Sequence, residues 1–352
     1  AALDRGVATA AVALVHSYRN PQHEEQLTEF LSDLGFAHVS CSARLAPRIK
    51  IVPRAETAVV NAYLSGVIGE YLATVGEAVR PGPLHVMTSA GSLVRAADYL
   101  PKDSLLSGPA GGVIGAAAAA GRSGWPRSLA VDMGGTSTDV SRFDGTLDYR
   151  CETLVGDARL LSPSLAIETV AAGGGSICSF DGRQLKVGPQ SAGADPGPAC
   201  YGARGPLTLT DVNLLLGRLS TESFEIPIDR QAAAAAAADL MADLGAASGH
   251  VPTQEEILQG FLDIANERMA AAVRRISIRE GYRPSEFVLV AFGGAGGQHA
   301  CALAEILAMD TVLIPEDAGL LSAIGLGQAR VERLAERQIL RRLDEVAEEL
   351  PG

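Results

Sequence analysis

Apolar positions along the chain follow two different spacings. Short continuous apolar runs, typical of buried strands, alternate with longer segments in which apolar residues recur every three or four positions, as in amphipathic helices. The strand-like runs cover residues 6–15, 38–40, 84–87, 128–131, 287–291 and 311–314. The main helix-like segments cover residues 21–34, 55–79, 253–280 and 299–307. The run of seven alanines within residues 231–244 predicts a further helix by propensity, and Thr253 with Glu256 forms a capping box at the start of residues 253–280. Because strands and helices alternate, the pattern predicts an α/β fold.

Two of the strand-like runs end directly in glycine-rich turns. Residues 131–140 read Val-Asp-Met-Gly-Gly-Thr-Ser-Thr-Asp-Val, and residues 292–297 read Phe-Gly-Gly-Ala-Gly-Gly. Glycine lets backbone N–H groups approach a ligand closely, and a helix that begins at the second turn points further donors above the sheet. The first turn is therefore a candidate phosphate contact, and its alternative is an ordinary β-hairpin. For the second turn, the alternative is plain strand-to-helix packing.

The side chains of the first turn fit a phosphate that is bound through a metal ion. Thr136, Ser137 and Thr138 supply hydroxyl donors. Asp132 and Asp139 cannot bind phosphate directly because like charges repel, but they can hold a magnesium ion, usually through water, that bridges to the phosphate. Asp132 is the first candidate for this role and Asp139 the second. For each, the alternative is a carboxylate that caps its own turn.

Small residues mark two further helices and suggest how the chain is divided. They fill residues 107–120 and 319–329, and small side chains let helices pack closely, which suits a connection between domains. With a linker-like turn after the first of these helices, we predict domains over 1–120 and 121–330, followed by a charged helix over 331–352. The glycine- and proline-rich residues 171–206 form an insertion in the second domain, and apolar residues within it favour an ordered structure.

Composition and charge exclude several classes of protein. The 352 residues suit about two domains, and 47% apolar with 20% charged residues is typical of a globular protein. A net charge of −12 argues against nucleic acid as a partner. We find no apolar run long enough to span a bilayer, no signal peptide and no C-x-x-C pair among the cysteines. We therefore expect a cytoplasmic protein with reduced thiols and no membrane partner.

Both ends of the sequence suggest a piece of a longer protein. The chain starts at Ala1 without methionine and enters a buried-strand pattern at once, which implies neighbouring strands upstream. At the other end, a charged helix expected from Ala329 to Leu350 carries an apolar stripe that needs a surface to cover. We therefore expect that the sequence is a fragment.

The combined motifs resemble the ATPase superfamily of actin, sugar kinases and heat-shock chaperones. In that superfamily two D-x-G-G-T turns grip phosphates from opposite domains, a later Gly-Gly turn takes the adenosine, and two connecting helices cross between the domains. Here the second phosphate turn would be residues 132–139 and the adenosine turn residues 293–296. The first phosphate turn is missing. The resemblance implies an α/β, two-lobed actin-like (ribonuclease H-like) ATPase fold with an incomplete first lobe.

A narrower resemblance is to the hydantoinase A/5-oxoprolinase family. The strings that carry it occur in family order across nearly all of residues 10–328. They are residues 16–21 with 23–24, 61–64, 107–112, 132–140, 172–176, 193–201, 210–213 and 292–300. The turn at residues 88–92 departs from the family pattern, because Ala90 and Ser92 stand where relatives often carry a polar residue and glycine.

This resemblance implies ATP- and Mg²⁺-dependent opening of a cyclic amide such as 5-oxo-L-proline or a hydantoin. Phosphorylation of the amide oxygen activates a poor electrophile before water attacks it, so the enzyme needs positioning and charge neutralisation rather than a covalent nucleophile. Relatives carboxylate acetone or acetophenone, so one alternative is the ATPase subunit of such a carboxylase, and another is an inactive scaffold fragment. The resemblance also implies a hydantoinase B-like subunit or domain, an oligomer, and an isolated fragment without activity.

The resemblance also assigns roles to individual residues. The phosphate contacts would be Gly134, Gly135, Thr136, Ser137 and Thr138. The nucleoside contacts would be Gly293, Gly294, Ala295 and Gly296, with His299 at the start of the following helix, where the dipole disfavours its protonated form. Asp132, Asp139 and Asp195 are the catalytic candidates. Asp195 and Asp211 either face the substrate or brace a loop.

Overall fold

The chain divides into two compact units. The computed structural model describes residues 2–224, 226–248, 252–334 and 339–346. Unit 1 comprises Ala1–Gly108, Tyr149–Leu165 and Arg330–Gly352, and unit 2 comprises Pro109–Asp148 and Ala166–Ala329. The sequence places a domain boundary at residue 120, which lies inside helix α4 (Ser107–Arg122).

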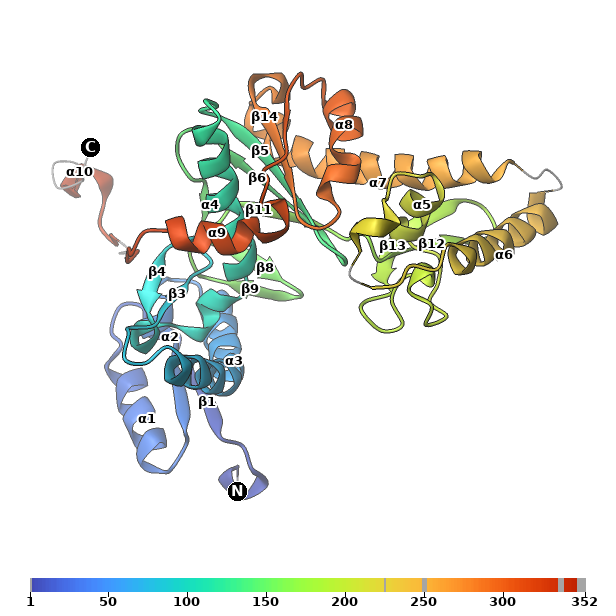
Figure 1. Ribbon diagram of the computed structural model, residues 1–352. Helices are drawn as coiled ribbons and strands as arrows, with labels where there is room; N and C mark the ends of the chain where they lie inside the picture. The colour runs from blue at the N-terminus through green and yellow to red at the C-terminus, as the bar shows by residue number, and fades with distance from the viewer. Residues whose placement is uncertain (1, 225, 249–251, 335–338, 347–352) are drawn as a thin grey trace. The chain divides into compact units, whose positions relative to one another are not determined.

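A five-stranded mixed sheet forms the centre of unit 2. Its strands lie in the order β11-β6-β5-β14-β15 (Figure 1). They span Ile167–Val170, Thr138–Phe143, Ser128–Met133, Val288–Phe292 and Val312–Leu313 respectively. Strands β5, β14 and β15 run parallel, whereas β6 pairs antiparallel with β5 and β11 antiparallel with β6. The alternation of strands and helices predicted this α/β class.

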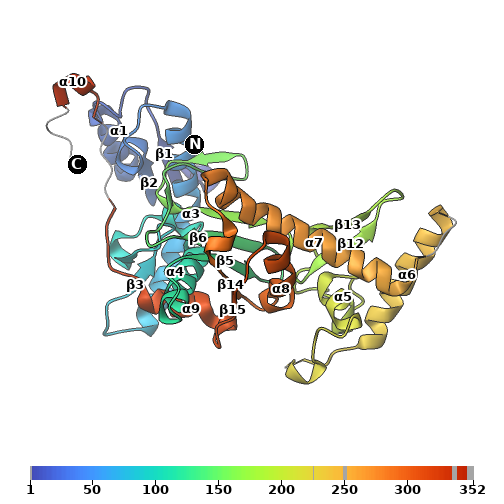
Figure 2. The same cartoon turned by 90° about the horizontal axis from the view of Figure 1, so that it is seen from above.

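Helices cover both faces of this sheet because side chains alternate along each strand. On one face, Leu129, Val131 and Leu289 pack with apolar residues of α7 (Gln254–Ile276) and α8 (Gly296–Leu307). On the other face, β14 residues pack with alanines of α4 and with Leu321. Figures 1 and 2 show α7 and α8 on one side and α4 with α9 (Leu321–Gln328) on the other.

The helices α4 and α9 cross backbone against backbone. A Cβ atom on Gly325 would lie 1.9 Å from the carbonyl oxygen of Gly111, and one on Gly115 would lie 2.4 Å from that of Leu321. No side chain fits at such distances, so the small residues that the sequence shows in these two helices are required for the close approach.

The glycine-rich insertion at residues 171–206 is ordered and carries its own hairpin. Strands β12 (Ser176–Phe180) and β13 (Leu185–Ser191) pair antiparallel beside α5 (Leu209–Leu215) and α6 (Arg230–Ser248). The run of alanines lies in α6, as predicted from helix propensity. Helix α7 begins with the predicted capping box, in which the Thr253 hydroxyl accepts a hydrogen bond from the Glu256 N–H.

Unit 1 contains a buried hydrogen-bond network around Glu24. Strands β1 (Thr9–Val12) and β2 (His38–Cys41) pair parallel, flanked by α1 (Gln22–Asp33) and α3 (Ile51–Ala78), and β1 is only half-buried among the described residues. Glu24 is fully buried and accepts hydrogen bonds from Leu14, Ser17, Ser42 and Ala43. Burial alone would raise the pKa of Glu24, but these hydrogen bonds lower it overall.

Unit 1 also contains several short helices and strands. They are α2 (Ser42–Leu45), β3 (His85–Met87), β4 (Leu93–Arg95), β7 (Tyr149–Arg150), β8 (Thr153–Val155), β9 (Ala158–Leu160), β10 (Ser164–Leu165) and α10 (Leu343–Val346). Strands β3 and β4 form a hairpin around residues 88–92, and β7 to β10 form two antiparallel pairs.

From the apolar pattern we expect no segment long enough to span a bilayer, but helix α3 meets the length and hydropathy criteria for one. With 28 residues and a window of mean hydropathy 1.2, it is long and apolar enough to cross a bilayer by length and composition alone. Only 22% of that window is buried, and Tyr63 and Val67 are exposed. One such helix is weak evidence for a membrane span, because core helices pass the same test.

The predicted C-terminal helix is not found at residues 330–334, which are extended. The Leu93 N–H donates to the Arg330 carbonyl, and Val331 forms a parallel bridge with Leu93, so the edge of β4 competes successfully with helix formation. Among the described residues beyond 334, only Leu343–Val346 is helical. The rest of the predicted helix lies partly outside the described residues.

Candidate functional site

The first glycine-rich turn connects β5 to β6 in a hairpin. Met133 pairs with Thr138, and the Gly134 N–H donates to the Ser137 carbonyl oxygen at 3.1 Å. Gly135 and Thr136 are exposed, and no heavy atom of the described residues lies within 4 Å of a Cβ built on Gly135. The hairpin geometry that was the alternative is therefore present, and it leaves the backbone at the tip open to a ligand.

A second glycine segment, residues 173–175, supports the turn from behind. The N–H groups of Gly174 and Gly175 donate to the carbonyl oxygens of Gly134 and Gly135 at 2.9 and 2.6 Å. A Cβ on Gly173 would lie 2.6 Å from the carbonyl carbon of Thr136. Because the two backbones touch, the conformation of the turn depends on this segment. The sequence showed the glycines but not their contact.

The second predicted glycine turn also packs directly on the first. The Ala295 N–H donates to the Met133 carbonyl oxygen at 2.9 Å. Gly293 has a φ of +77°, and a Cβ there would lie 2.4 Å from Asp132 Oδ1. Gly294 is exposed, with no atom from the described part of the chain within 4 Å of its Cβ position, and Gly296 begins α8. The structure therefore brings both predicted turns together, with the free N–H groups of a helix start beside them.

Asp132 and Asp139 face each other across the base of the hairpin, where they are paired residues of β5 and β6. Burial, then the charge of Asp139, raises the pKa of Asp132 to about 6, although Ser322 lowers it by donating a hydrogen bond at 3.4 Å. Burial also raises the pKa of Asp139, which accepts a hydrogen bond from Thr169 at 2.5 Å. A divalent cation between the two carboxylates would relieve this repulsion.

These two carboxylates fit magnesium as an incomplete donor set. No group of three or more His, Cys, Asp or Glu side chains in the described part of the chain is placed to hold a metal ion. Magnesium keeps several waters and is commonly bound by one or two carboxylates together with substrate phosphates. Asp132 and Asp139 would supply the protein's share, in keeping with binding through water.

Thr138 and His299 lie in the core rather than at the open side of the turns. Thr138 is fully buried and donates its hydroxyl to the Ala172 carbonyl. His299 is fully buried, with Nδ1 at 2.7 Å from Asn266 Oδ1 and Nε2 at 3.3 Å from Asn213 Nδ2. Burial, then the charge of Arg218, lowers the pKa of His299 to about 4, so it stays neutral. These contacts support the turns and leave neither side chain free toward a ligand.

Asp195 and Asp211 have different surroundings. Asp195 is exposed on the loop that follows Ala192, whose N–H donates to the Gly175 carbonyl at 2.8 Å. Asp211 is fully buried and accepts hydrogen bonds from the N–H groups of Ala199, Cys200 and Thr208. Asp211 therefore braces the loop, whereas the predicted catalytic role of Asp195 stays a prediction.

Ser322 is a site residue that sequence reasoning missed. It lies in α9, 190 residues after the aspartate to which it donates. Its only signal in the sequence is its place in the small-residue helix, and the contact follows from the crossing of α4 and α9 beside β14.

Comparison with known proteins identifies the family. The sequence profile of the hydantoinase/oxoprolinase family matches residues 54–335. The chain belongs to this family. The family prediction is thereby confirmed, and the family strings around the three glycine segments are the ones that meet in unit 2.

Relatives within the family include hydrolases of cyclic amides. The chain is 42% identical over 339 residues to the 5-oxoprolinase of Saccharomyces cerevisiae, covering 93% of this chain and 26% of that protein. It is 35% identical over 347 residues to caprolactamase subunit alpha of Pseudomonas jessenii, covering 94% of this chain and 49% of that subunit. The chain therefore spans between about a quarter and a half of these relatives.

Two solved structures confirm the fold. The nucleotide-free structure of an acetone carboxylase, described as ATP-dependent, matches with a TM-score of 0.78 at 27% identity, covering 93% of this chain and 48% of that one. The crystal structure of the ATP-dependent caprolactamase from Pseudomonas jessenii matches with a TM-score of 0.76 at 34% identity, covering 92% of this chain and 48% of that one. The α/β, actin-like ATPase fold predicted from the motifs is confirmed.

Proposed function

We propose that the chain is the ATP-binding portion of an enzyme that opens a cyclic amide at the expense of ATP. The observation that carries the proposal is the facing pair Asp132 and Asp139 at the base of a turn whose tip is open backbone. Relatives named 5-oxoprolinase and caprolactamase support the substrate class.

The chemistry that we propose is phosphoryl transfer to the amide oxygen. That oxygen bonds to the terminal phosphorus of ATP while the bond from phosphorus to ADP breaks. One water then adds to the activated carbon, the C–N bond breaks with its electron pair going to nitrogen, and nitrogen takes a proton. A second water releases phosphate from the resulting acyl phosphate. Ring opening thus consumes two waters and leaves ADP and phosphate.

The residues of unit 2 suit the first step. Magnesium held through Asp132 and Asp139 would neutralise phosphate charge, and catalysis of phosphoryl transfer is largely positioning and electrostatic stabilisation. The backbone N–H groups of the exposed residues Gly135 and Thr136, and those at the start of α8, would fix the phosphates and the nucleotide. We also propose a cytoplasmic, oligomeric enzyme that works with a hydantoinase B-like subunit or domain.

The test is a substrate panel on the full-length protein with its partner. We expect ATP hydrolysis coupled to loss of 5-oxo-L-proline, a hydantoin or caprolactam, measured as ADP and amino acid released together. The Asp132→Ala variant should lose coupled turnover by at least about a hundredfold. Wild-type rates in this variant would remove Asp132 from the mechanism.

The second candidate is the ATPase subunit of a ketone carboxylase, which the match to acetone carboxylase favours. ADP release with acetone and bicarbonate, but with none of the cyclic amides, would select it. If the full-length protein consumes ATP with neither substrate class, the chain belongs to an inactive scaffold.

A further inference from the structure

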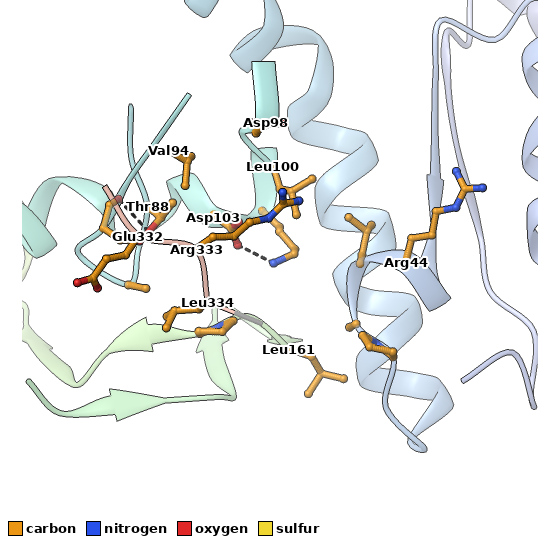
Figure 3. A pocket seen from close by; sticks show the side chains of 17 residues that line it. Arg44, Thr88, Val94, Asp98, Leu100, Asp103, Leu161, Glu332, Arg333 and Leu334 are labelled. Carbon is orange, nitrogen blue, oxygen red and sulfur yellow. Dashed lines mark hydrogen bonds and ion pairs between the residues drawn. The ribbon is translucent and has the colours of Figure 1, made fainter. Parts of the chain in front are cut away.

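A pocket lies within unit 1, and its lining does not include Asp132 or Asp139. The proposed function above does not use this pocket. Its volume is about 330 Å³, which is at the small end of the range for sites that bind small molecules. Figure 3 shows its lining side chains, among them Thr88, Val94, Leu100, Asp103 and Leu161. The wall combines apolar side chains with polar and charged ones, which make up eight of the 17 lining residues, so it is more polar than most small-molecule sites.

The polar centre of this pocket is a buried ion pair between neighbouring residues. Lys102 is only 4% exposed, and its Nζ lies 2.6 Å from Asp103 Oδ1 and 3.0 Å from Ser162 Oγ. Ser162 also donates to Asp103 Oδ1 at 2.5 Å. A buried lysine is costly unless it is paired, so these groups form a fixed arrangement.

The backbone around the pair is held from two other elements. The Lys102 N–H donates to Asn61 Oδ1 of α3 at 3.1 Å. The Asp103 carbonyl accepts hydrogen bonds from both the N–H and the hydroxyl of Ser89, each at 2.7 Å. Ser89 belongs to the β3–β4 turn whose Ala90 and Ser92 also line the pocket. The pair is therefore positioned before any ligand arrives, as binding sites require.

The pair leaves one donor and one acceptor unused. An ammonium carries three N–H donors, and a carboxylate oxygen can accept more than one hydrogen bond. Among the contacts of the described residues, Lys102 Nζ uses two donors and Asp103 Oδ2 has no partner. Both side chains line the pocket. The pocket thus offers a donor next to an acceptor.

We propose that this pocket binds the ring of a cyclic amide through the N–H and C=O edge of the amide. In a small lactam the amide is cis, so its N–H and C=O project side by side from one edge of the ring. Lys102 would donate to the carbonyl oxygen, Asp103 Oδ2 would accept from the N–H, and apolar side chains such as Val94 and Leu100 would cover the ring carbons. This inference rests on the proposed function and adds the substrate-binding residues to it.

The experiment uses the full-length protein with its partner and measures KM for 5-oxo-L-proline and for ATP separately. Val94→Phe and Ala90→Leu reduce the pocket volume, and Asp103→Asn keeps the shape but places an N–H₂ donor opposite the lactam N–H. We expect each variant to raise KM for the lactam by about tenfold or more, with KM for ATP unchanged. The matched control is Ala97→Leu, an exposed position outside the pocket lining, which should leave both constants unchanged.

A second readout separates recognition from mere folding. In the wild type, 2-pyrrolidone should compete with 5-oxo-L-proline better than N-methyl-2-pyrrolidone does, because the methyl group removes the N–H donor. This preference should disappear in Asp103→Asn, provided that thermal unfolding shows the variant folded. If Asp103→Asn does not fold, the two volume-reducing variants decide.

The outcomes distinguish this inference from the proposed function. Lactam-dependent ATP hydrolysis with unchanged lactam KM in the folded variants would overturn the pocket assignment alone. The complete absence of lactam-dependent ATP hydrolysis in the wild type would overturn the proposed function and this inference with it.

Discussion

The ionised carboxylate of Asp132 lowers the stability of the folded state. This carboxylate is partly buried beside Asp139, and both effects raise its pKa, to about 6. The folded state therefore keeps the proton to higher pH than the unfolded state, whose carboxyl has a pKa near 3.8. Stability is lost as the pH rises from about 4 through 6. Strain of this kind concentrates at functional sites.

The variant Asp132→Asn should therefore be more stable than the wild type at pH 8 without metal ions. The gain, discounted for partial exposure of the side chain, is about 1 kcal/mol, and it should vanish near pH 4, where the wild-type carboxyl is neutral. Thermal unfolding of the full-length protein across this pH range measures it. An equal gain at both pH values would mean that the buried negative charge of Asp132 is not the cause.

Gly135 and Gly173 both belong to glycine segments, yet they are glycine for different reasons. A Cβ on Gly173 would collide with backbone, whereas one on Gly135 would have no atom within 4 Å among the residues that the structure describes, and φ at Gly135 is not in the left-handed region. The fold therefore does not require glycine at Gly135.

We expect Gly135→Ala to leave stability within about 0.5 kcal/mol of the wild type and to weaken ATP binding by about tenfold, because the added methyl group blocks close approach of phosphate to the backbone. Thermal unfolding and ATP titration of the same full-length protein provide the two values. Unchanged ATP affinity would show that phosphate does not contact the tip of the turn.

At the scale of elements, the contact between α4 and α9 rests on individual glycines. Gly325→Ala places a methyl group 1.9 Å from the Gly111 carbonyl oxygen, so the helices must separate. We expect a loss of roughly 3 kcal/mol or more, at the upper end of what overpacking costs. The control is Gly327→Ala in the same helix, where the added methyl group has no atom of residues 2–224, 226–248, 252–334 or 339–346 within 4 Å, and this variant should be neutral or slightly stabilising. Urea unfolding of both variants compares them, and equal stabilities would contradict the close crossing.

Elements with strong local signals were predictable from the sequence. The alanine run predicted α6, and the capping box predicted the start of α7. The two glycine turns follow buried strands, as predicted. Partners far apart in the sequence were not predictable. The contact of Ser322 with Asp132, the support of the turn by residues 173–175 and the ion pair at Lys102 arise only in the folded chain.

The prediction of a C-terminal helix was wrong at residues 330–334 for a related reason. The charged, apolar-striped pattern of this segment is that of a helix, but Arg330 and Val331 pair with the exposed edge of β4 instead. Helix propensity is a weak preference that a tertiary hydrogen-bond partner overrides. Local sequence patterns also did not predict that the chain returns to unit 1. Residues Tyr149–Leu165 belong to unit 1, although the segments before and after them belong to unit 2.

At the scale of the whole molecule, the number of phosphate turns limits what this chain does alone. The 352 residues contain one Asp-x-Gly-Gly-Thr turn, and the actin-like ATPases that the motifs resemble use two. We therefore expect the 352-residue chain to bind ATP at least about 100-fold more weakly than the full-length protein, a loss of ~2.8 kcal/mol of contacts. Calorimetric titration with MgATP measures both affinities. If the two values agree within about threefold, the turn at residues 132–139 and the turn at residues 293–296 suffice for nucleotide binding, and a second phosphate turn is not needed.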